Sequence, residues 1–180
     1  MLMSSVRSGQ YEAMATLFER HHKRLFHFFL GLTGQRGFSE DLVQEVFLRI
    51  LKYRSSFKPG SPFTPWMFRI ARRLHLDQAY RHAAETPLGP MEEAVPDHRE
   101  GIHERLERDS DRWLLARALE QLDPDKRELL LLSRDPGLTC KDLAAIFECT
   151  EGTVKVKVHR ALQELRTAFQ KIPGGALVMR

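Results

Sequence analysis

Basic side chains gather in the stretch TCKDLAAIFECTEGTVKVKVHRALQELR, which runs from Thr139 to Arg166. A helical wheel of its second half puts polar and basic residues on one face, where lysine and arginine can neutralise phosphates. Arg160 is the best candidate for a two-point contact with guanine. A plain solvated face is the alternative interpretation. The candidate DNA-contacting residues of this helix are Thr153, Lys155, Val156, Lys157, His159 and Arg160.

Two consecutive helices must position that basic face. Thr139 followed by Asp142 is a capping-box-like start for the first helix, and Thr150 can cap the second. A buried face opposite a basic one is typical of a helix-turn-helix whose second helix enters the major groove of DNA. The predicted buried residues are Leu143, Ala144, Ile146 and Phe147 in the first helix and Val154, Val158, Ala161, Leu162 and Leu165 in the second.

A second candidate surface lies far upstream, in SEDLVQEVFLRILKY. Helical spacing gives this segment one apolar face and one polar face. The polar face can dock a partner, or it can simply be solvated. Its residues are Glu40, Asp41, Gln44, Glu45 and Arg49.

Apolar periodicity predicts the elements of the first half. A long helix covers residues 11–32, and a second one, capped by Ser39, runs to about residue 53. A third starts near Thr64 and Pro65, where proline is tolerated in the first turn, and continues to about residue 82. These helices would hold the upstream surface.

The rest of the chain predicts a second helical half. Residues 83–111 contain prolines, glycines and acids without apolar periodicity, and we interpret them as an acidic, flexible linker. Helical spacing returns from residue 103 to residue 122, and Asp123 can cap the short helix RELLLLS. The predicted fold is all-α: two small helical domains, 1–82 and 112–171, joined by the linker and followed by a tail, 172–180.

The composition sets outer limits on function. The chain has 180 residues, a formal net charge of +4 and a pI near 9.3, which permit a polyanionic partner without requiring one. Cys140 and Cys149 are too few for a disulfide framework. We see neither a signal peptide nor a run long enough to span a membrane, so we expect a cytoplasmic protein without a membrane partner.

Three segments, in this order, resemble the bacterial RNA polymerase sigma-70 family: SEDLVQEVFLRI, FKPGSPFTPWMFRIARRLHLDQAYR and LTCKDLAAIFECTEGTVKVKVHRALQELR. The pattern is most similar to the extracytoplasmic-function (ECF) group, which keeps only the second and fourth sigma domains. The resemblance covers about residues 11–81 and 113–170. It implies a sigma factor that binds core RNA polymerase and directs promoter-specific initiation.

The resemblance also implies roles for the upstream surface. In the family this helix docks on the clamp helices of the largest polymerase subunit, and the flap is a further polymerase contact. Carried over, this assigns core polymerase binding to Asp41, Gln44, Glu45 and Arg49. An anti-sigma factor is a further partner that is common in the group.

The loop from Ser56 to Phe63 and the helix around Trp66 resemble the element that opens and reads the −10 promoter region. Separated strands are held by stacking and by backbone charge. Trp66 can equally be an ordinary core tryptophan. The candidate −10 residues are Phe57, Phe63, Trp66, Arg69, Arg72, Arg73 and Arg81. The helix-turn-helix then corresponds to the reader of the −35 element.

The sequence departs from the family pattern at three of these positions. Val156 and Lys157 stand where a small hydroxyl residue and arginine are common, and Arg73 stands where asparagine is common. Lysine lacks the planar fork of arginine, while valine can meet a thymine methyl group. We therefore expect phosphate contacts to be retained and base preference to be altered.

Two other classes of protein are alternatives to a sigma factor. A stand-alone helix-turn-helix regulator would leave SEDLVQEVFLRI and the aromatic and basic helix without a role. A DNA-processing enzyme would need a nucleophile with partners or a metal cluster. The serines Ser39, Ser55 and Ser56 have no partner constellation, and the histidines His21, His22 and His27 have no acids at metal-ligand spacing. We expect no enzymatic activity, no cofactor and no metal.

Overall fold

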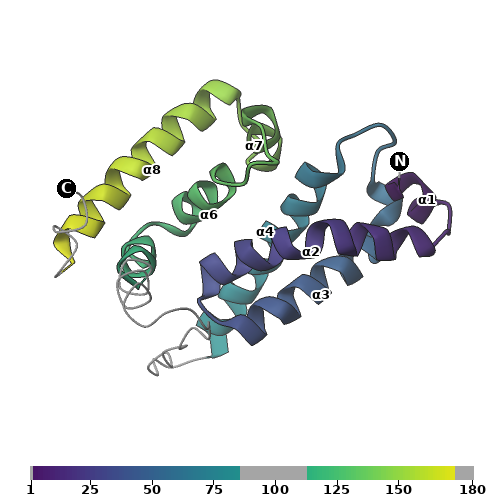
Figure 1. Ribbon diagram of the computed structural model, residues 1–180, viewed down its shortest axis with the longest axis horizontal. Coiled ribbons are helices and arrows are strands. Elements are labelled where there is room, and N and C mark those ends of the chain that lie inside the picture. Colours follow the sequence, from purple (N-terminus) through teal and green to yellow (C-terminus); the bar gives the residue numbers. More distant parts are fainter. Residues whose placement is uncertain (1, 86–112, 173–180) are drawn as a thin grey trace, which may run out of the picture.

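The computed structural model describes residues 2–85 and 113–172 of the chain. Within these residues every regular element is helical, as the sequence predicted, and there is no strand. Figure 1 shows two groups of helices that lie against each other. The elements are α1 (Leu2–Arg7), α2 (Glu12–Thr33), α3 (Arg36–Lys52), the 3-10 turn η1 (Arg54–Ser56), α4 (Phe63–Glu85), α6 (Pro124–Ser133), α7 (Cys140–Ile146) and α8 (Glu151–Lys171), and residues 113–120 are also helical.

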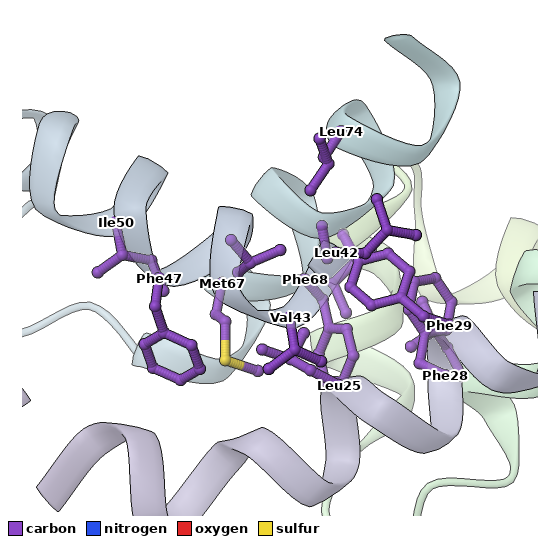
Figure 2. Packing of buried hydrophobic residues seen from close by; sticks show 14 of the residues in the cluster. Leu25, Phe28, Phe29, Leu42, Val43, Phe47, Ile50, Met67, Phe68 and Leu74 are labelled. Atoms are coloured by element: carbon purple, nitrogen blue, oxygen red, sulfur yellow. The ribbon is translucent and has the colours of Figure 1, made fainter. Parts of the chain in front are cut away.

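Helices α2, α3 and α4 form the first bundle around a shared apolar core, seen from close by in Figure 2. Phe29, Leu42 and Phe68, one from each helix, are all but completely buried. The ring of Phe28 meets that of Phe68 edge-on, with centroids 5.5 Å apart, a favoured aromatic geometry. This packing fixes α3 beside α4. The polar face of α3 and the helix α4, which carries the candidate aromatic and basic residues, therefore lie side by side.

The start of α3 differs from the sequence prediction. Ser39 does not cap this helix, because α3 already begins at Arg36 and Ser39 is buried within its first turn. Its hydroxyl donates to the Gln35 carbonyl at 2.6 Å and lies 2.9 Å from the hydroxyl of Thr33. Gly34, with φ of +67°, ends α2 in the left-handed conformation that favours glycine. The turn is therefore tighter than the spacing suggested.

The sequence analysis did not predict helix α1, because a segment of six residues is too short to show a helical periodicity of apolar residues. It packs on α2, and its Met3 and Val6 are buried.

Helices α6, α7 and α8 form the second bundle, and its caps agree with the sequence prediction. The side chain of Asp123 accepts from the backbone N–H of Asp125, two residues into the turn that starts α6. Thr139 and Asp142 form a full capping box on α7, and Thr150 accepts from the N–H of Thr153 at the start of α8. Helices α7 and α8 are thus the two arms of the predicted helix-turn-helix.

The described residues form two clusters of buried apolar side chains: one spans both bundles, and the other lies within the second half of the chain, between residues 114 and 172. Helix α4 packs against α7, and α2 packs against α6, which also contacts α8. A single cluster of buried residues runs from Phe68 in the first bundle to Leu129, Ile146 and Val154 in the second. The sequence predicted two units and a joint, and gave no sign that the units would pack together.

Helix α4 extends to Glu85, so the first residues of the predicted linker 83–111 are helical. The remainder of that linker, the predicted helical spacing before residue 113 and the tail after residue 172 lie outside the described residues.

Candidate nucleic-acid interface

The polar face of α3 is largely open to solvent. Asp41 and Gln44 are exposed, and the side chain of Glu45 is 43% exposed. Leu48 follows on the same face at helical spacing and is 61% exposed. Sequence reasoning missed Leu48, although its place outside the buried spacing of α3 was a usable signal. The face therefore combines acids and an amide with one apolar residue.

Arg49, on the edge of this face, is not a free cation. Its guanidinium donates to Glu45 of the same helix at 3.0 Å and to Asp77 of α4 at 3.0 Å. Burial by itself lowers the pKa of Arg49, but the hydrogen bonds to Asp77 and Glu45 outweigh it, so the net shift is upward. Arg49 thus ties the polar face of α3 to α4.

An open groove of about 1160 Å³ runs between α3, the loop after it and α4. It is larger than the usual pocket for a drug-sized ligand and fits an extended chain better than a compact one. Cations and aromatic rings line it together, which is the combination that single-stranded nucleic acid requires. The lining residues with these side chains are Arg49, Lys52, Tyr53, Phe57, Lys58, Trp66, Arg69 and Arg73.

Trp66 is the centre of an aromatic group in this groove. Its ring centroid lies 5.2 Å from that of Phe57 and 6.1 Å from that of Phe63, in tilted or edge-on arrangements. Trp66 and Phe63 are partly buried, whereas Phe57 is only 4% exposed. Phe57 therefore lies underneath and supports the ring of Trp66, which remains accessible from the groove.

The four candidate arginines of α4 do not share one surface. Arg69 and Arg73 are exposed and line the groove, one helical turn apart. Arg72 points to the other side of α4, where it binds residues of the second bundle and is 16% exposed. The side chain of Arg81 lies outside the described residues.

Three further groove residues were missed by sequence reasoning. Lys52 ends α3, Tyr53 follows it with 46% of its surface exposed, and Lys58 lies in the loop before α4. All three lie within segments that the sequence analysis quoted, and their signal was that each is a cation or an aromatic residue at the end of α3 or in the loop that follows it.

The outward face of α8 agrees with its helical wheel. Thr153, Lys155, Lys157 and His159 are exposed, as is Arg160. On the opposite face, which packs against α6 and α7, Val154 and Ala161 are buried, whereas Val158, Leu162 and Leu165 are half-buried. Val156 lies near the middle of the outward face and is 50% exposed. A basic surface with a central apolar residue is therefore presented to any duplex that approaches α8.

Arg160 lies one helical turn after Val156 on the same outward face. It lines a smaller hollow of about 390 Å³ together with Gln163, Glu164 and Gln121. Thr153 is held by its role in the cap, because its hydroxyl lies 2.9 Å from that of Thr150. The accessible centre of the reading face is thus formed by Val156 and its immediate neighbours.

In the described part of the chain there is no group of three or more histidines, cysteines or acids placed to hold a metal ion. Over the same residues, no helix combines the length and the apolar character needed to span a membrane.

A groove lined by cations and aromatic rings, in the same chain as a helix-turn-helix, is typical of an all-helical protein that binds nucleic acid. Residues 17–85 match the family described as Sigma-70 region 2, and residues 112–165 match Sigma-70, region 4. The RNA polymerase sigma factor CarQ of Myxococcus xanthus is 31% identical over 174 residues, which cover 91% of this chain and 93% of the relative. The ECF RNA polymerase sigma factor SigL of Mycobacterium tuberculosis is 28% identical over 94% of this chain and 96% of its own. The chain therefore belongs to the ECF group of the sigma-70 family of RNA polymerase sigma factors.

Solved structures agree on the fold. CnrH, solved in complex with the cytosolic domain of CnrY, has a TM-score of 0.71 at 24% identity and covers 96% of this chain and 97% of its own. The sigma factor RpoE of Bartonella quintana, solved with the anti-sigma factor NepR, has a TM-score of 0.69 at 25% identity and covers 88% of this chain and 98% of its own.

Proposed function

We propose that this sigma factor binds core RNA polymerase through α3 and uses the adjacent groove to hold one strand of the opened −10 region. The observation that carries the proposal is the combination in one groove of Trp66 with the exposed cations Arg69 and Arg73. Stacking on aromatic rings and backbone charge are what a separated strand requires. The sequence analysis named these three residues as candidates for −10 binding. Their position in one groove supports that assignment.

Core binding is assigned to Asp41, Gln44 and Glu45, with Leu48 added as an apolar anchor. All four recur at helical spacing on the solvent side of α3, so one partner surface can contact them together. Arg49 is assigned a linking role, because it is bonded to Asp77 of α4. Arg49 thereby links the face of α3 that binds the polymerase to α4, the helix that carries the groove cations Arg69 and Arg73.

The −35 element is assigned to the outward face of α8. Its lysines supply phosphate contacts, and Val156 supplies an apolar contact in the major groove. Two linked DNA sites raise each other's effective concentration, so neither needs high affinity alone.

An anti-sigma factor is the further partner in this proposal, since solved relatives carry one. It would cover the same α3 face and basic groove. The proposal places the protein in the cytoplasm, where polymerase and promoters are found.

The experiment that tests core binding is gel filtration of the purified protein with bacterial core RNA polymerase. The wild type is expected to co-elute, and the double variant Gln44→Ala, Glu45→Ala is expected to co-elute weakly. The matched control is Gln10→Ala, Glu19→Ala, which removes the same two groups from exposed positions on α2 and in the turn before it. The control is expected to behave as the wild type.

A protein that elutes alone but still shifts duplex DNA would instead be the stand-alone regulator, and the α3 assignment would fall. Equal weakening by the control pair would show that loss of charge, and not the α3 face, is responsible.

A further inference from the structure

The loop between α3 and α4, residues 53–62, forms part of the −10 groove and has little regular structure of its own. Its only regular element is the turn η1, which is three residues long. Tyr53, Phe57 and Lys58 of this loop line the groove. A loop that is not held in the free protein must be ordered when a ligand binds, and this ordering weakens the affinity. The contacts that hold the loop therefore contribute to how well the groove binds a strand.

Helix α1, at the start of the chain, is short but ends in a complete capping turn. The N–H of Gln10 donates to the Ser5 carbonyl at 2.9 Å, and the N–H of Gly9 donates to the Val6 carbonyl at 3.1 Å. These two hydrogen bonds, with Gly9 at a φ of +94°, form the Schellman motif that ends many helices. Met3 and Val6 are buried, and Val6 is 0% exposed. Helix α1 is therefore a well-defined part of the first bundle.

Helix α1 contacts the groove loop as well as α2. It packs on η1, and Nη1 of Arg7 donates to the Phe57 carbonyl at 3.4 Å, across fifty residues of sequence. Phe57 is the residue whose ring lies 5.2 Å from that of Trp66 and supports it. Arg7 thus reaches the backbone of the residue beneath the candidate stacking surface.

A second contact from the N-terminal segment reaches the other end of η1. The ring centroid of Tyr11, in the turn before α2, lies 5.8 Å from the guanidinium carbon of Arg54, within the range of a cation–π attraction. Arg54 also donates to the carbonyl of Leu51, near the end of α3, at 2.7 Å. The N-terminal segment therefore holds η1 at its first residue, through Arg54, and at the residue that follows it, through Phe57.

Burial of apolar side chains accounts for Met3 and Val6, but it does not account for Arg7. Arg7 is exposed, so water could solvate its charge without any partner in the protein. Its hydrogen bond to a distant backbone carbonyl restrains the loop, which the attachment of α1 to α2 alone would not do. Helix α1 also precedes the residues that match Sigma-70 region 2, which begin at residue 17. The contact is therefore additional to the part of the chain that the family defines.

We propose that α1 is a positioning element for −10 recognition, in which Arg7 fixes the loop 53–62 and, through Phe57, the ring of Trp66. This inference rests on the proposed function of the groove. Arg7 is a positioning residue, because it acts on the strand through Phe57 and Trp66 and not by a contact of its own. Loss of the Arg7 contact weakens binding of the −10 strand and leaves core binding through α3 unchanged.

The positioning effect is tested first in the free full-length protein, without DNA or polymerase. The chain has two tryptophans, Trp66 and the exposed Trp113, so Trp113→Phe leaves Trp66 as the only one and serves as the reference protein. Arg7→Ala in this reference is expected to increase the quenching of Trp66 fluorescence by acrylamide, because the ring is held less firmly. Arg7→Lys keeps one donor for the Phe57 carbonyl and is expected to stay closer to the reference.

A second variant disturbs α1 without changing charge, and a third is the matched control. Gly9→Val places a β-branched residue at a φ of +94°, which such residues strongly disfavour. It is expected to increase the quenching as Arg7→Ala does, with helical content preserved by circular dichroism. The control is Arg36→Ala, which removes an exposed arginine bonded to Glu40 at the opposite end of α3 from the loop, and it is expected to match the reference. The proposal is overturned if neither Arg7→Ala nor Gly9→Val changes the quenching.

Strand binding is then tested with the holoenzymes of the same proteins and a labelled single-stranded −10 oligonucleotide, by fluorescence anisotropy. Arg7→Ala is expected to weaken binding by about two- to tenfold, the range for ordering one side chain on binding. The affinity for core polymerase, measured by titration, is expected to match the reference. Increased quenching without weaker strand binding would overturn the role of α1 in −10 recognition.

A double-mutant cycle separates positioning from direct contact. In a Trp66→Ala background, Arg7→Ala is expected to change strand binding little, because its effect passes through that ring. An equal loss in both backgrounds would mean that Arg7 contacts DNA by itself, and would overturn the positioning role. If no holoenzyme binds the oligonucleotide, the proposed function of the groove fails, whereas the quenching result still decides whether α1 holds Trp66.

Discussion

Trp66 offers the sharpest single-residue test of the groove. Trp66→Ala in the holoenzyme is expected to weaken binding of a single-stranded −10 oligonucleotide by about 1–3 kcal/mol, because stacking on an aromatic ring contributes that much per base. Fluorescence anisotropy of a labelled oligonucleotide measures the loss.

Two further variants separate stacking from stability. Trp66→Tyr keeps a ring over Phe57 and is expected to retain most of the affinity. Trp113→Ala removes an exposed tryptophan of the second half and is expected to change nothing. Loss of affinity in Trp66→Tyr equal to that in Trp66→Ala would argue that Trp66 acts through packing and not as a stacking surface.

Val156 and Lys157 are expected to set the −35 preference. Val156 lies near the middle of the exposed face of α8, where it can meet a base edge. The double variant Val156→Ser, Lys157→Arg is expected to shift the selected −35 bases, with discrimination changes of about 1–3 kcal/mol for a two-point contact. Selection of promoters from a randomised pool by the holoenzyme measures the shift.

The matched control places similar changes further along α8. Thr167→Ser, Lys171→Arg alters two exposed residues beyond the outward reading surface. It is expected to leave the selected bases as they are in the wild type. An unchanged preference in the Val156, Lys157 variant would mean that other residues read the element.

His21 gives the protein a pH dependence of stability. Burial lowers the pKa of His21 below 6.5, and the charges of Arg24 and Arg20 lower it further, against a smaller opposing effect of Asp135. The unfolded chain therefore binds this proton more readily than the folded one. The free energy of unfolding should fall as the pH drops below about 6.5 and level off below the folded pKa.

Urea unfolding of the wild type and of His21→Gln at pH 7.5 and pH 5.5 measures this effect. Contributions of other titrating groups cancel in the difference between the two proteins. The variant is expected to lose less stability on acidification than the wild type. A difference that is independent of pH would exclude His21 as the cause.

At the scale of elements, the capping box of α7 is the clearest local determinant. Thr139 accepts from the backbone N–H of Asp142 at 3.1 Å, and Asp142 accepts from that of Thr139 at 2.9 Å. Thr139→Ala is expected to destabilise the protein by about 1 kcal/mol. Urea unfolding of Thr139→Ala, Asp142→Ala and the double variant measures how far the two bonds depend on each other.

Thr167→Ala is the control. Thr167 lies within α8, and its hydroxyl donates to the carbonyl of Gln163 in the preceding turn of the same helix. Alanine is the better helix former there, so no loss is expected. Destabilisation by Thr139→Ala no greater than that of the control would contradict the assigned role of the cap.

Features set by neighbours in the chain were predictable from the sequence. The caps at Asp123, Thr139 and Thr150 depend on residues at most a few positions apart, and all three were confirmed. The exposed face of α8 was confirmed as well, while its buried face was confirmed at Val154 and Ala161 and is half-buried at Val158, Leu162 and Leu165. The prediction for Ser39 was wrong for the same kind of reason: a serine before acids is a good cap, but the helix had already begun at Arg36.

Features set by distant partners were not predictable. The motif named Arg49 and Arg72 without indicating that the first bonds Asp77 or that the second bonds Glu128, since these partners come from other helices. Phe57 likewise looked like a contact residue and lies beneath Trp66. A single sequence shows which residue types occur and how they are spaced. It does not show which helices pack together, and so it does not show which partner each side chain reaches.

At the scale of the whole molecule, the shared core predicts how the free protein unfolds. Because one buried cluster spans both bundles, and Leu131 and Val158 pack against both it and the second cluster, the wild type is expected to unfold in a single calorimetric transition. Asp135→Arg places like charges against Arg24 across the two bundles and is expected to give two transitions. Glu164→Arg makes the same change in a pair with Lys126 inside the second bundle, and is expected to keep a single transition. Two transitions in the wild type would contradict a common core in solution.

The contact between the two bundles, in which α2 packs against α6 and α4 against α7, also affects how long the protein survives in the cell. Separation would bring Leu131 and the apolar residues around it into water, and exposed apolar patches invite aggregation and capture by proteases. A variant in which the two bundles come apart is therefore expected to be removed from the cell faster than the wild type.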